Sequence, residues 1–144
     1  MEVIMTEYKF FDALPDDARM IRTEVFCDEQ GFIEEFDSID DTAVHVVAYY
    51  NGEPAATGRI FTEDDPTVRH IGRVAVRKKF RGLKIGEGVM MILEASARES
   101  GAEYTELSSQ CQARGFYEKC GYTAHGDIYM DQHCPHILMK KRLI

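Results

Sequence analysis

Residues 74–95 read VAVRKKFRGLKIGEGVMMILEA and are the most informative part of the sequence. The first three residues end a predicted strand, and Ile85, Val89 and Leu93 give the last part the apolar side of a helix. The loop between them is basic and rich in glycine. A strand that runs into such a loop and then into a helix directs unpaired backbone N–H groups and the positive end of the helix dipole at one point. The stretch therefore predicts a site for an anionic group.

The side chains of this loop favour the same prediction. Gly82, Gly86 and Gly88 have no side chain to keep a phosphate away from the backbone. The spacing matches neither the P-loop nor the dinucleotide-binding pattern G-x-G-x-x-G. Taken alone, the loop is also compatible with a glycine-rich helix entry in a solvated basic segment. Its positive charges are those of Arg77, Lys78, Lys79, Arg81 and Lys84.

Outward from this stretch, predicted strands and helices follow one another along the chain. Pro15-Asp16-Asp17 opens a helix that Gly31 stops, and Asn51-Gly52 predicts a hairpin turn. Two further helices are expected, over 85–95 with an end at Gly101, and over 113–119. The order of the elements predicts a mixed α/β fold. Strands are expected over 2–10, 43–50, 54–61, 67–76, 103–107, 122–130 and 136–143.

Length and composition favour a single domain over residues 1–144. With 44% hydrophobic residues, a chain of 144 residues can bury roughly 68–70% of its unfolded surface without disulfides. Its 4 cysteines show none of the short paired spacings of a zinc site or a disulfide framework. His133-Cys134-Pro135-His136 lacks a second ligand pair, so no metal is expected. Without a basic leader or a long apolar run, we expect a soluble, cytoplasmic protein that does not enter a membrane.

The formal net charge of −8 is divided unevenly along the sequence. Residues 1–65 hold 17 Asp and Glu against 4 Lys and Arg, whereas residues 66–144 hold 8 against 13. The acidic half suits a cationic partner and the basic half suits phosphate. The alternative is that both are solvated faces that keep the domain soluble. Nucleic acid is not expected as a partner, because the net charge is negative and the basic segment is short.

Two motifs identify a resemblance to the GCN5-related N-acetyltransferase (GNAT) family. Residues 81–86 resemble its coenzyme A-binding motif Q/R-x-x-G-x-G/A, with Arg81 and Gly86 at the outer positions and Lys84 where the middle glycine is usual. Residues 116–122, FYEKCGY, are similar to the family's late F-Y-x-x-x-G-F segment. The resemblance implies a GNAT-like mixed, mostly antiparallel central sheet flanked by helices.

Within that family the chain resembles the group typified by ElaA and YjcF. The similar segments are Arg22-x-x-Val25-Phe26-x-x-Glu29-Gln30-Gly31 and Glu35-Phe36-Asp37-x-x-Asp40. His45, Gln110 and His136 continue the pattern. The likeness thus extends over nearly the whole chain.

The resemblance implies acetyl-CoA as the cosubstrate, held between the strand that ends at Val76 and the strand before Gln110. The backbone N–H of Val76 is then the expected oxyanion donor, and the Tyr117 phenol the catalytic acid for the departing thiolate. An aromatic ring that packs on the next strand is the alternative role for Tyr117. The residues expected at the cosubstrate are Val74, Ala75, Val76, Arg81, Gly82, Leu83, Lys84, Ile85, Gly86, Glu87, Gln110 and Phe116.

The second substrate implied is an amine, which must lose a proton before it attacks. The resemblance puts a group of residues near its binding site but singles out no base, and each has a structural alternative such as a solvated carboxylate or a core histidine. Cys111 and Cys120 are interpreted as packing residues, because direct transfer needs no thiol. The residues expected near the amine are Arg22, Glu29, Glu35, Asp37, Asp40 and His45.

The sequence therefore predicts an enzyme that transfers acetyl from acetyl-CoA to a primary amine of a small molecule or peptide by direct attack. A homodimer is compatible with it. Two alternatives remain open at this point. One is a non-enzymatic CoA-binding sensor, and the other is an acyltransferase like the acyl-homoserine-lactone synthases, against which the basic loop argues.

Overall fold

The structure, a computed structural model, describes residues 5–144 and is built on a seven-stranded sheet of order β1-β2-β3-β4-β5-β7-β6. The described residues also form three α-helices, and further 3₁₀- and π-helical segments lie in the connections between strands and helices. The strands are β1 (Thr6–Phe11), β2 (Val44–Tyr50), β3 (Glu53–Phe61), β4 (Val68–Val76), β5 (Tyr104–Gln110), β6 (Thr123–Asp131) and β7 (Cys134–Arg142). The α-helices are α1 (Asp16–Arg22), α2 (Ile85–Glu99) and α3 (Arg114–Lys119).

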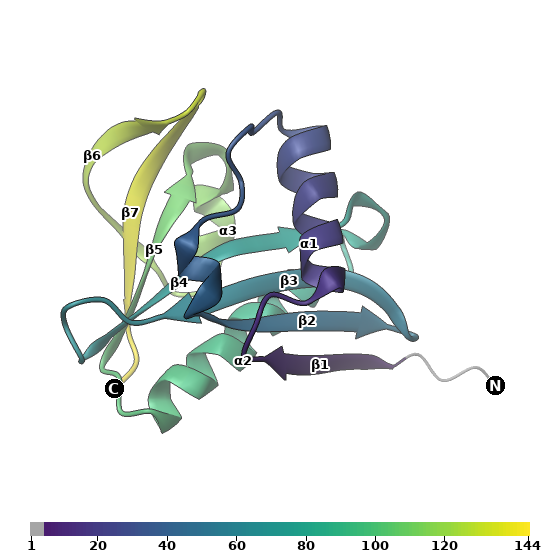
Figure 1. The fold of residues 1–144 in the computed structure, drawn as a ribbon. Coiled ribbons are helices and arrows are strands. Elements are labelled where there is room, and N and C mark those ends of the chain that lie inside the picture. Colours follow the sequence, from purple (N-terminus) through teal and green to yellow (C-terminus); the bar gives the residue numbers. More distant parts are fainter. Residues whose placement is uncertain (1–4) are drawn as a thin grey trace.

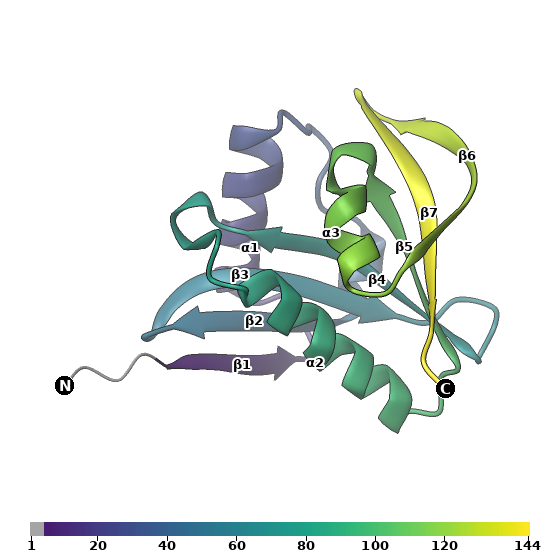
Figure 2. The ribbon, with the colours of Figure 1, turned by 180° about the vertical axis from the view of Figure 1, so that it is seen from behind.

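The helices cover both faces of the sheet. Helix α1 lies on one face in Figure 1, and α2 and α3 lie on the other in Figure 2. Every strand pair is antiparallel except β4 with β5, which is parallel. This is the mixed, mostly antiparallel sheet flanked by helices that the sequence predicts. In the part of the chain that the structure describes, no helix is long and apolar enough to cross a membrane.

The two faces of the sheet carry separate hydrophobic clusters, because neighbouring residues of a strand point to opposite sides. On the α2 face, Val46 and Ile71 pack with Leu93. On the α1 face, Val47 and Ala75 pack with Ile21. Strand β3 lies between these layers and is buried over most of its length, and residues 54–58 are accordingly apolar or small rather than alternating.

Strands β4 and β5 pair only at one end, and this fixes the position of the functional site. Their register is limited to Val68–His70 against Tyr104–Glu106. Beyond it the strands diverge, as Figure 2 shows. A bulge lies in the same region, because Gly72 pairs with Arg59 and Ala75 with Thr57, so that two residues of β4 oppose one of β3. Arg73 adopts a φ of 50° in this bulge.

Most element positions predicted from the sequence are confirmed, with three corrections. The helix that begins at Asp16 changes to a π-helix over Thr23–Glu29, a wider turn that periodicity does not indicate. The expected acidic loop contains a 3₁₀-helix over Ser38–Asp41. The strand predicted over 103–107 continues to Gln110 because it pairs with β7 throughout. Residues 2–4 of the first predicted strand lie outside the described residues.

Candidate active site

Two openings meet where β4 and β5 diverge. The first, which we call the α2 cleft, has a volume of about 520 Å³ and is lined mainly by residues 74–76, 80–82, 84–87, 112–113 and 116–117. The second, the splay cavity, has a volume of about 180 Å³ and is lined by residues of the segments 26–35, 71–74, 107–117 and 131–136. Gln30, Val74, Ala113 and Tyr117 line both openings. The two openings therefore lie against each other at the gap in the sheet.

The amino terminus of α2 forms one wall of the α2 cleft. The first backbone hydrogen bond of this turn runs from the Gly88 N–H to the Lys84 carbonyl, 3.2 Å away. The amides of residues 85–87 precede it and have no intrahelical acceptor, as at the start of any helix. These N–H groups and the helix dipole favour an anion here.

Lys84 shows why the family motif usually has glycine at its position. Its φ is 61°, in the left-handed region that costs a residue with a side chain roughly 1–2 kcal/mol. Gly82, two residues earlier, has a φ of 83°. The chain therefore keeps a left-handed backbone at the unusual residue and adds a positive charge beside the helix terminus.

The other two glycines of the loop have different neighbours. A Cβ on Gly86 would lie 3.3 Å from the Phe116 ring and from the Val76 side chain, so this position admits no larger residue without displacing the cleft wall. A Cβ on Gly88 would overlap the hydroxyl group of Tyr8. Gly88 thus makes room for a tyrosine of β1, and not for the phosphate that its place in the loop suggested.

Several of the basic side chains of the loop are already paired. Arg81 forms two hydrogen bonds of 2.7 Å to the Glu29 carboxylate, which lowers the pKa of that carboxyl, and its Nε donates to the Val76 carbonyl at 2.9 Å. Arg77 pairs with Glu24. Among residues 5–144 no ion pair engages Lys78 or Lys84, so these ammonium groups are available to an anionic ligand.

Tyr117, on α3, stands at the junction of the two openings. Burial raises the pKa of its phenol, and Cys120 adds to the shift, so the hydroxyl keeps its proton. The rings of Phe116 and Tyr122 both meet the Tyr117 ring edge-on, with centroid distances of 5.0 Å and 6.1 Å. The ring is thus packed as the alternative role predicts, while its side chain still lines both openings.

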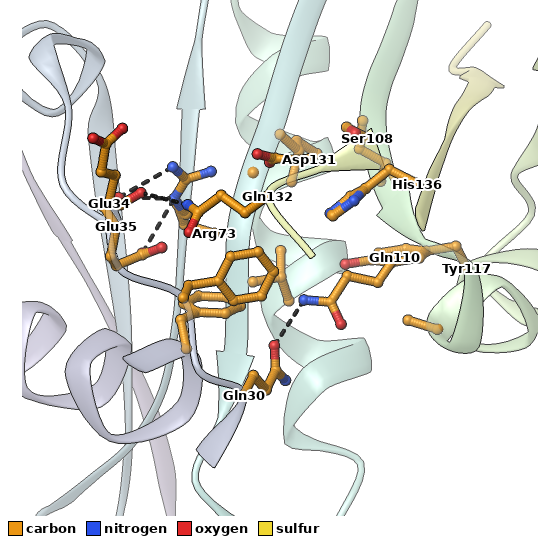
Figure 3. A pocket seen from close by; sticks show the side chains of 17 residues that line it. Gln30, Glu34, Glu35, Arg73, Ser108, Gln110, Tyr117, Asp131, Gln132 and His136 are labelled. Carbon is orange, nitrogen blue, oxygen red and sulfur yellow. Dashed lines mark hydrogen bonds and ion pairs between the residues drawn. The ribbon is translucent and has the colours of Figure 1, made fainter. Parts of the chain in front are cut away.

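The splay cavity is closed by contacts between segments that are far apart in the sequence (Figure 3). Gln110 of β5 donates to the side-chain oxygen of Gln30 at 2.7 Å. The turn between β6 and β7 lies across the loop that follows the π-helix, where Gln132 accepts from the Ile33 N–H at 3.0 Å and donates to the Glu34 carbonyl at 3.2 Å. These contacts fix the cavity walls.

A buried network of ion pairs lies behind the splay cavity. Arg22 bonds to Glu35 at 2.7 Å and to Asp40 at 2.6 Å. Arg59 bonds to Asp37 at 2.7 Å and to Asp40 at 2.8 Å. The carboxylates of the acidic loop are thereby matched by arginines from α1 and β3, and the loop is fastened to the sheet.

Arg73 connects this network to the β4 bulge. Its Nε lies 3.1 Å from the Glu35 carboxylate, and its Nη2 donates to the Glu35 carbonyl at 3.1 Å. The bonds from the Arg73 side chain to Glu35 therefore hold this residue in its left-handed backbone conformation. Sequence inspection missed both Arg59 and Arg73 because an arginine within a strand pattern gives no sign of its partner.

The residues predicted near the amine thus lie in two separate places. Arg22 and Glu29 do not orient each other, because the π-helix sends Arg22 into the buried network and Glu29 to Arg81. The Nε2 of His45 lies 3.0 Å from the Asp40 carbonyl within the core. Of the predicted residues only Glu35 lines the splay cavity, and its carboxylate faces Arg22 and Arg73.

The titration of the network follows from this geometry. Burial raises the pKa of Asp40, but hydrogen bonds and charge from Arg22 and Arg59 outweigh it and hold the pKa at about 2. For Glu35 burial dominates, and the pKa is raised in spite of Arg73 and Arg22. Burial lowers the pKa of His45, so the ring is neutral and serves the packing of the network.

The splay cavity also contains polar residues to which the sequence analysis gave no role. Figure 3 shows them around its walls. They have no shared motif, since they come from four separated segments, and only Gln30 and His136 stand in the family pattern. They are Gln30, Glu34, Arg73, Ser108, Asp131, Gln132 and His136. Within residues 5–144 no group of three or more His, Cys, Asp or Glu side chains could hold a metal ion.

Comparison with known proteins gives the class. A family model described as an acetyltransferase (GNAT) domain matches residues 16–143. The chain therefore belongs to the GNAT family of acetyltransferases, as its two motifs predicted. The family uses acetyl-CoA as donor, and the anion-binding turn and open cleft at α2 fit that ligand.

Individual proteins confirm the resemblance within the family. The Bacillus subtilis (strain 168) protein described as uncharacterized N-acetyltransferase YjcF is 34% identical over 128 residues, which cover 87% of this chain and 90% of that protein. Escherichia coli ElaA superposes with a TM-score of 0.84 at 26% identity, covering 95% and 99% of the two chains. An aminoglycoside 6'-N-acetyltransferase complexed with coenzyme A shares the fold, with a TM-score of 0.74 at 16% identity over 96% and 97%.

Proposed function

We propose that the chain transfers the acetyl group of acetyl-CoA directly to a primary amine. The observation that carries the proposal is the meeting of the α2 cleft and the splay cavity at Val74 and Tyr117. A donor held in the cleft and an amine held in the cavity would touch only through this gap. Direct attack needs that arrangement, because it brings the nucleophile and the acyl carbon together without a covalent enzyme intermediate.

In this proposal the anionic part of acetyl-CoA lies against the turn from Gly82 to Glu87. The unpaired amides of 85–87 and the ammonium group of Lys84 supply the attraction. Arg81 contributes through its contact with the Val76 carbonyl and Glu29, which keeps the turn against the end of β4. Ile85 and Phe116 provide the apolar surroundings, whereas Leu83, expected at the cosubstrate, is exposed and does not line the cleft. Acetyl-CoA supplies the activated acyl group, and the chain supplies its orientation.

The backbone of β4 supports the predicted role of Val76. The Arg77 N–H bonds to the Ala55 carbonyl on the β3 side. Because backbone groups alternate along a strand, the N–H group of Val76 points the other way, into the gap where β5 has diverged. A donor fixed in this gap is suited to stabilise the oxyanion that develops on the acetyl carbonyl. Ala75 then lines the cleft without offering this N–H.

Tyr117 is the proposed acid. Its phenol keeps its proton because burial raises the pKa, and it has no hydrogen-bond partner among the described residues that would divert it. The proton would pass to the sulfur as the carbon–sulfur bond breaks. Cys120, one turn later, is a poor alternative nucleophile because burial raises the pKa of its thiol.

The splay cavity favours a cationic amine. Glu34 and Asp131 line it, are exposed, and have no ion pair among residues 5–144. Glu35 is balanced by arginines, so these two carboxylates supply the net charge of the cavity mouth. Asp37 and Asp40 are bonded to Arg59. The attraction of a cationic amine to the acidic half of the sequence is therefore proposed to come mainly from Glu34 and Asp131.

Calorimetric titration with acetyl-CoA, followed by an acetylation assay with spermidine, glucosamine and lysine amide, tests the proposal. We expect binding of acetyl-CoA and release of CoA that depends on one of these amines. Binding without turnover of any amine would favour the non-enzymatic sensor. Absence of binding at millimolar acetyl-CoA would contradict both functions.

A further inference from the structure

His136 of β7 is a buried histidine whose ring faces the splay cavity (Figure 3). Its register partners are Gln110 on β5 and Tyr129 on β6. Side chains of directly paired residues lie on the same face of a sheet. His136 therefore stands between two polar side chains on the side of the sheet where the cavity lies.

Its ring orientation and its tautomer are both fixed. Nδ1 lies 2.9 Å from the Cys134 carbonyl oxygen. A carbonyl only accepts hydrogen bonds, so the hydrogen of the neutral ring is on Nδ1 and Nε2 carries the lone pair. The Phe32 ring meets the imidazole at 69°, and the Tyr129 ring stacks at 26° on it. The lone pair is thereby held in one direction.

The free nitrogen distinguishes His136 from its neighbours. Among the described residues its Nε2 has no hydrogen-bond partner, yet it is not one of the enclosed polar atoms, so it opens onto the cavity. The Nε2 of His133 is engaged by the Gln30 carbonyl at 2.7 Å, and that of His45 by the Asp40 carbonyl at 3.0 Å. Of the three histidines only His136 lines the splay cavity, so only its free nitrogen can face a ligand there.

The other ionisable groups around the cavity are less suited to accept a proton at its centre. Glu35 is bonded to Arg22 and Arg73, and Tyr117 and Tyr129 present phenols. Glu34 and Asp131 are exposed at the mouth. These groups, with Cys134 and His133 beside the ring, are the titratable and charged residues that face His136 from β4, β6, β7, α3 and the loop after the π-helix.

We propose that His136 is the general base that deprotonates the substrate amine, an inference that rests on the proposed acetyl transfer. An N–H bond of the ammonium group breaks and its proton goes to Nε2, which leaves the lone pair on the substrate nitrogen. That lone pair forms the N–C bond, the C–S bond breaks, and the sulfur takes the proton of Tyr117. The second proton of the nitrogen returns to the Tyr117 oxygen, and His136 releases its proton to solvent.

The tautomer gives a test that does not depend on activity. In protein labelled with ¹⁵N-histidine, the His136 signal, identified by its loss in His136→Asn, is expected to show a protonated Nδ1 and an unprotonated Nε2 in the neutral ring. The opposite tautomer would overturn the proposal, because Nε2 would then carry a hydrogen and offer no lone pair to the cavity.

Kinetics give the second test. His136→Asn keeps an N–H near the position of Nδ1 for the Cys134 carbonyl but removes the base, and His136→Gln is a second variant with a different shape. We expect kcat/KM for the best amine among spermidine, glucosamine and lysine amide to fall about 100-fold at neutral pH, the usual scale of general-base catalysis. The loss should shrink as rising pH supplies free amine. His125→Asn, which alters an exposed histidine of β6, is the matched control and should retain the wild-type profile.

The outcomes separate this inference from the proposed function. Inactive wild-type protein that binds acetyl-CoA would contradict the transfer itself. If the wild type is active and both His136 variants lose the same factor in kcat/KM at all pH values, His136 has a packing role and is not the base. Unchanged kcat/KM in folded variants with normal acetyl-CoA affinity would do the same.

Discussion

The α2 cleft is formed largely by one continuous run of chain, whereas the splay cavity is assembled from four separated segments. The cleft depends on backbone: left-handed residues at Gly82 and Lys84, and free amides at the start of α2. The cavity depends on side chains held by a buried ion network and by the β6–β7 turn. Substitutions in the cleft should therefore change ligand binding locally, whereas substitutions in the ion network should lower the stability of the whole fold.

The largest expected effect comes from the network. Asp40→Ala leaves the buried guanidinium groups of Arg22 and Arg59 without their shared carboxylate, and removing one partner of a buried pair typically costs about 3–5 kcal/mol. Urea denaturation should show this loss of unfolding free energy. Asp41→Ala changes an exposed neighbour and serves as the control. A loss below about 1 kcal/mol for Asp40→Ala would mean that the network adds little to the fold.

At the point where the two openings meet, Tyr117→Phe removes the proposed proton donor but little volume. We expect kcat to fall about 100-fold while acetyl-CoA affinity stays nearly unchanged, because the proton is needed mainly in the transition state. Steady-state kinetics with calorimetry of the variant measures both quantities. If Tyr117→Phe and the wild type had the same kcat across the pH range, Tyr117 would have a packing role alone.

Acid should weaken the network in a defined pH window. The pKa of Asp40 is held at about 2 against an ordinary value of 3.8, so its contribution is complete above pH 3.8 and is lost as the pH falls through about 2. By linkage the loss amounts to about 2 kcal/mol. Glu35 has the opposite sign, because its raised pKa makes ionisation unfavourable to folding above pH 4.5.

Denaturant unfolding of the wild type and of Asp40→Asn at pH 5, 3 and 2 measures this dependence. The wild type should lose more stability than the variant between pH 5 and 2. Parallel curves for the two proteins would show that Asp40 does not carry the acid sensitivity.

Gly86→Val tests the cleft. The added side chain meets Phe116 and Val76 and fills the turn where the phosphates would lie against the backbone, so acetyl-CoA should bind at least about tenfold more weakly. Gly115→Ala, whose Cβ would have open space around it, is the control for calorimetry. A folded Gly86→Val protein that binds as tightly as the wild type would contradict the assignment of the cleft.

The smallest effect concerns the charge at the mouth of the cavity. Glu34→Gln combined with Asp131→Asn should lower kcat/KM for a cationic amine about twofold at low salt, where the Debye length is several times the ~8 Å of physiological salt and exposed charges act farther. The kcat/KM of the wild type for the cationic amine should fall by the same factor as the salt concentration rises. A flat salt response would refute electrostatic attraction of the amine while leaving acetyl transfer intact.

The sequence predicts the fold class and the elements that form the α2 cleft. The strand, glycine loop and helix of residues 74–95 are contiguous, so hydrophobic period and glycine spacing predict both the elements and the anion-binding turn. Even the exception at Lys84 is a local matter, since its left-handed backbone stays where the motif requires it.

The tertiary structure decided where the charges act. The halves of the sequence with opposite charge are not opposite faces of the molecule, because Arg73, Arg77 and Arg81 of the basic half pair with Glu35, Glu24 and Glu29 of the acidic half. Ion pairs depend on distances between side chains from different elements, and composition carries no such information. The same holds for His136, whose free nitrogen is defined by a strand register and by one backbone carbonyl.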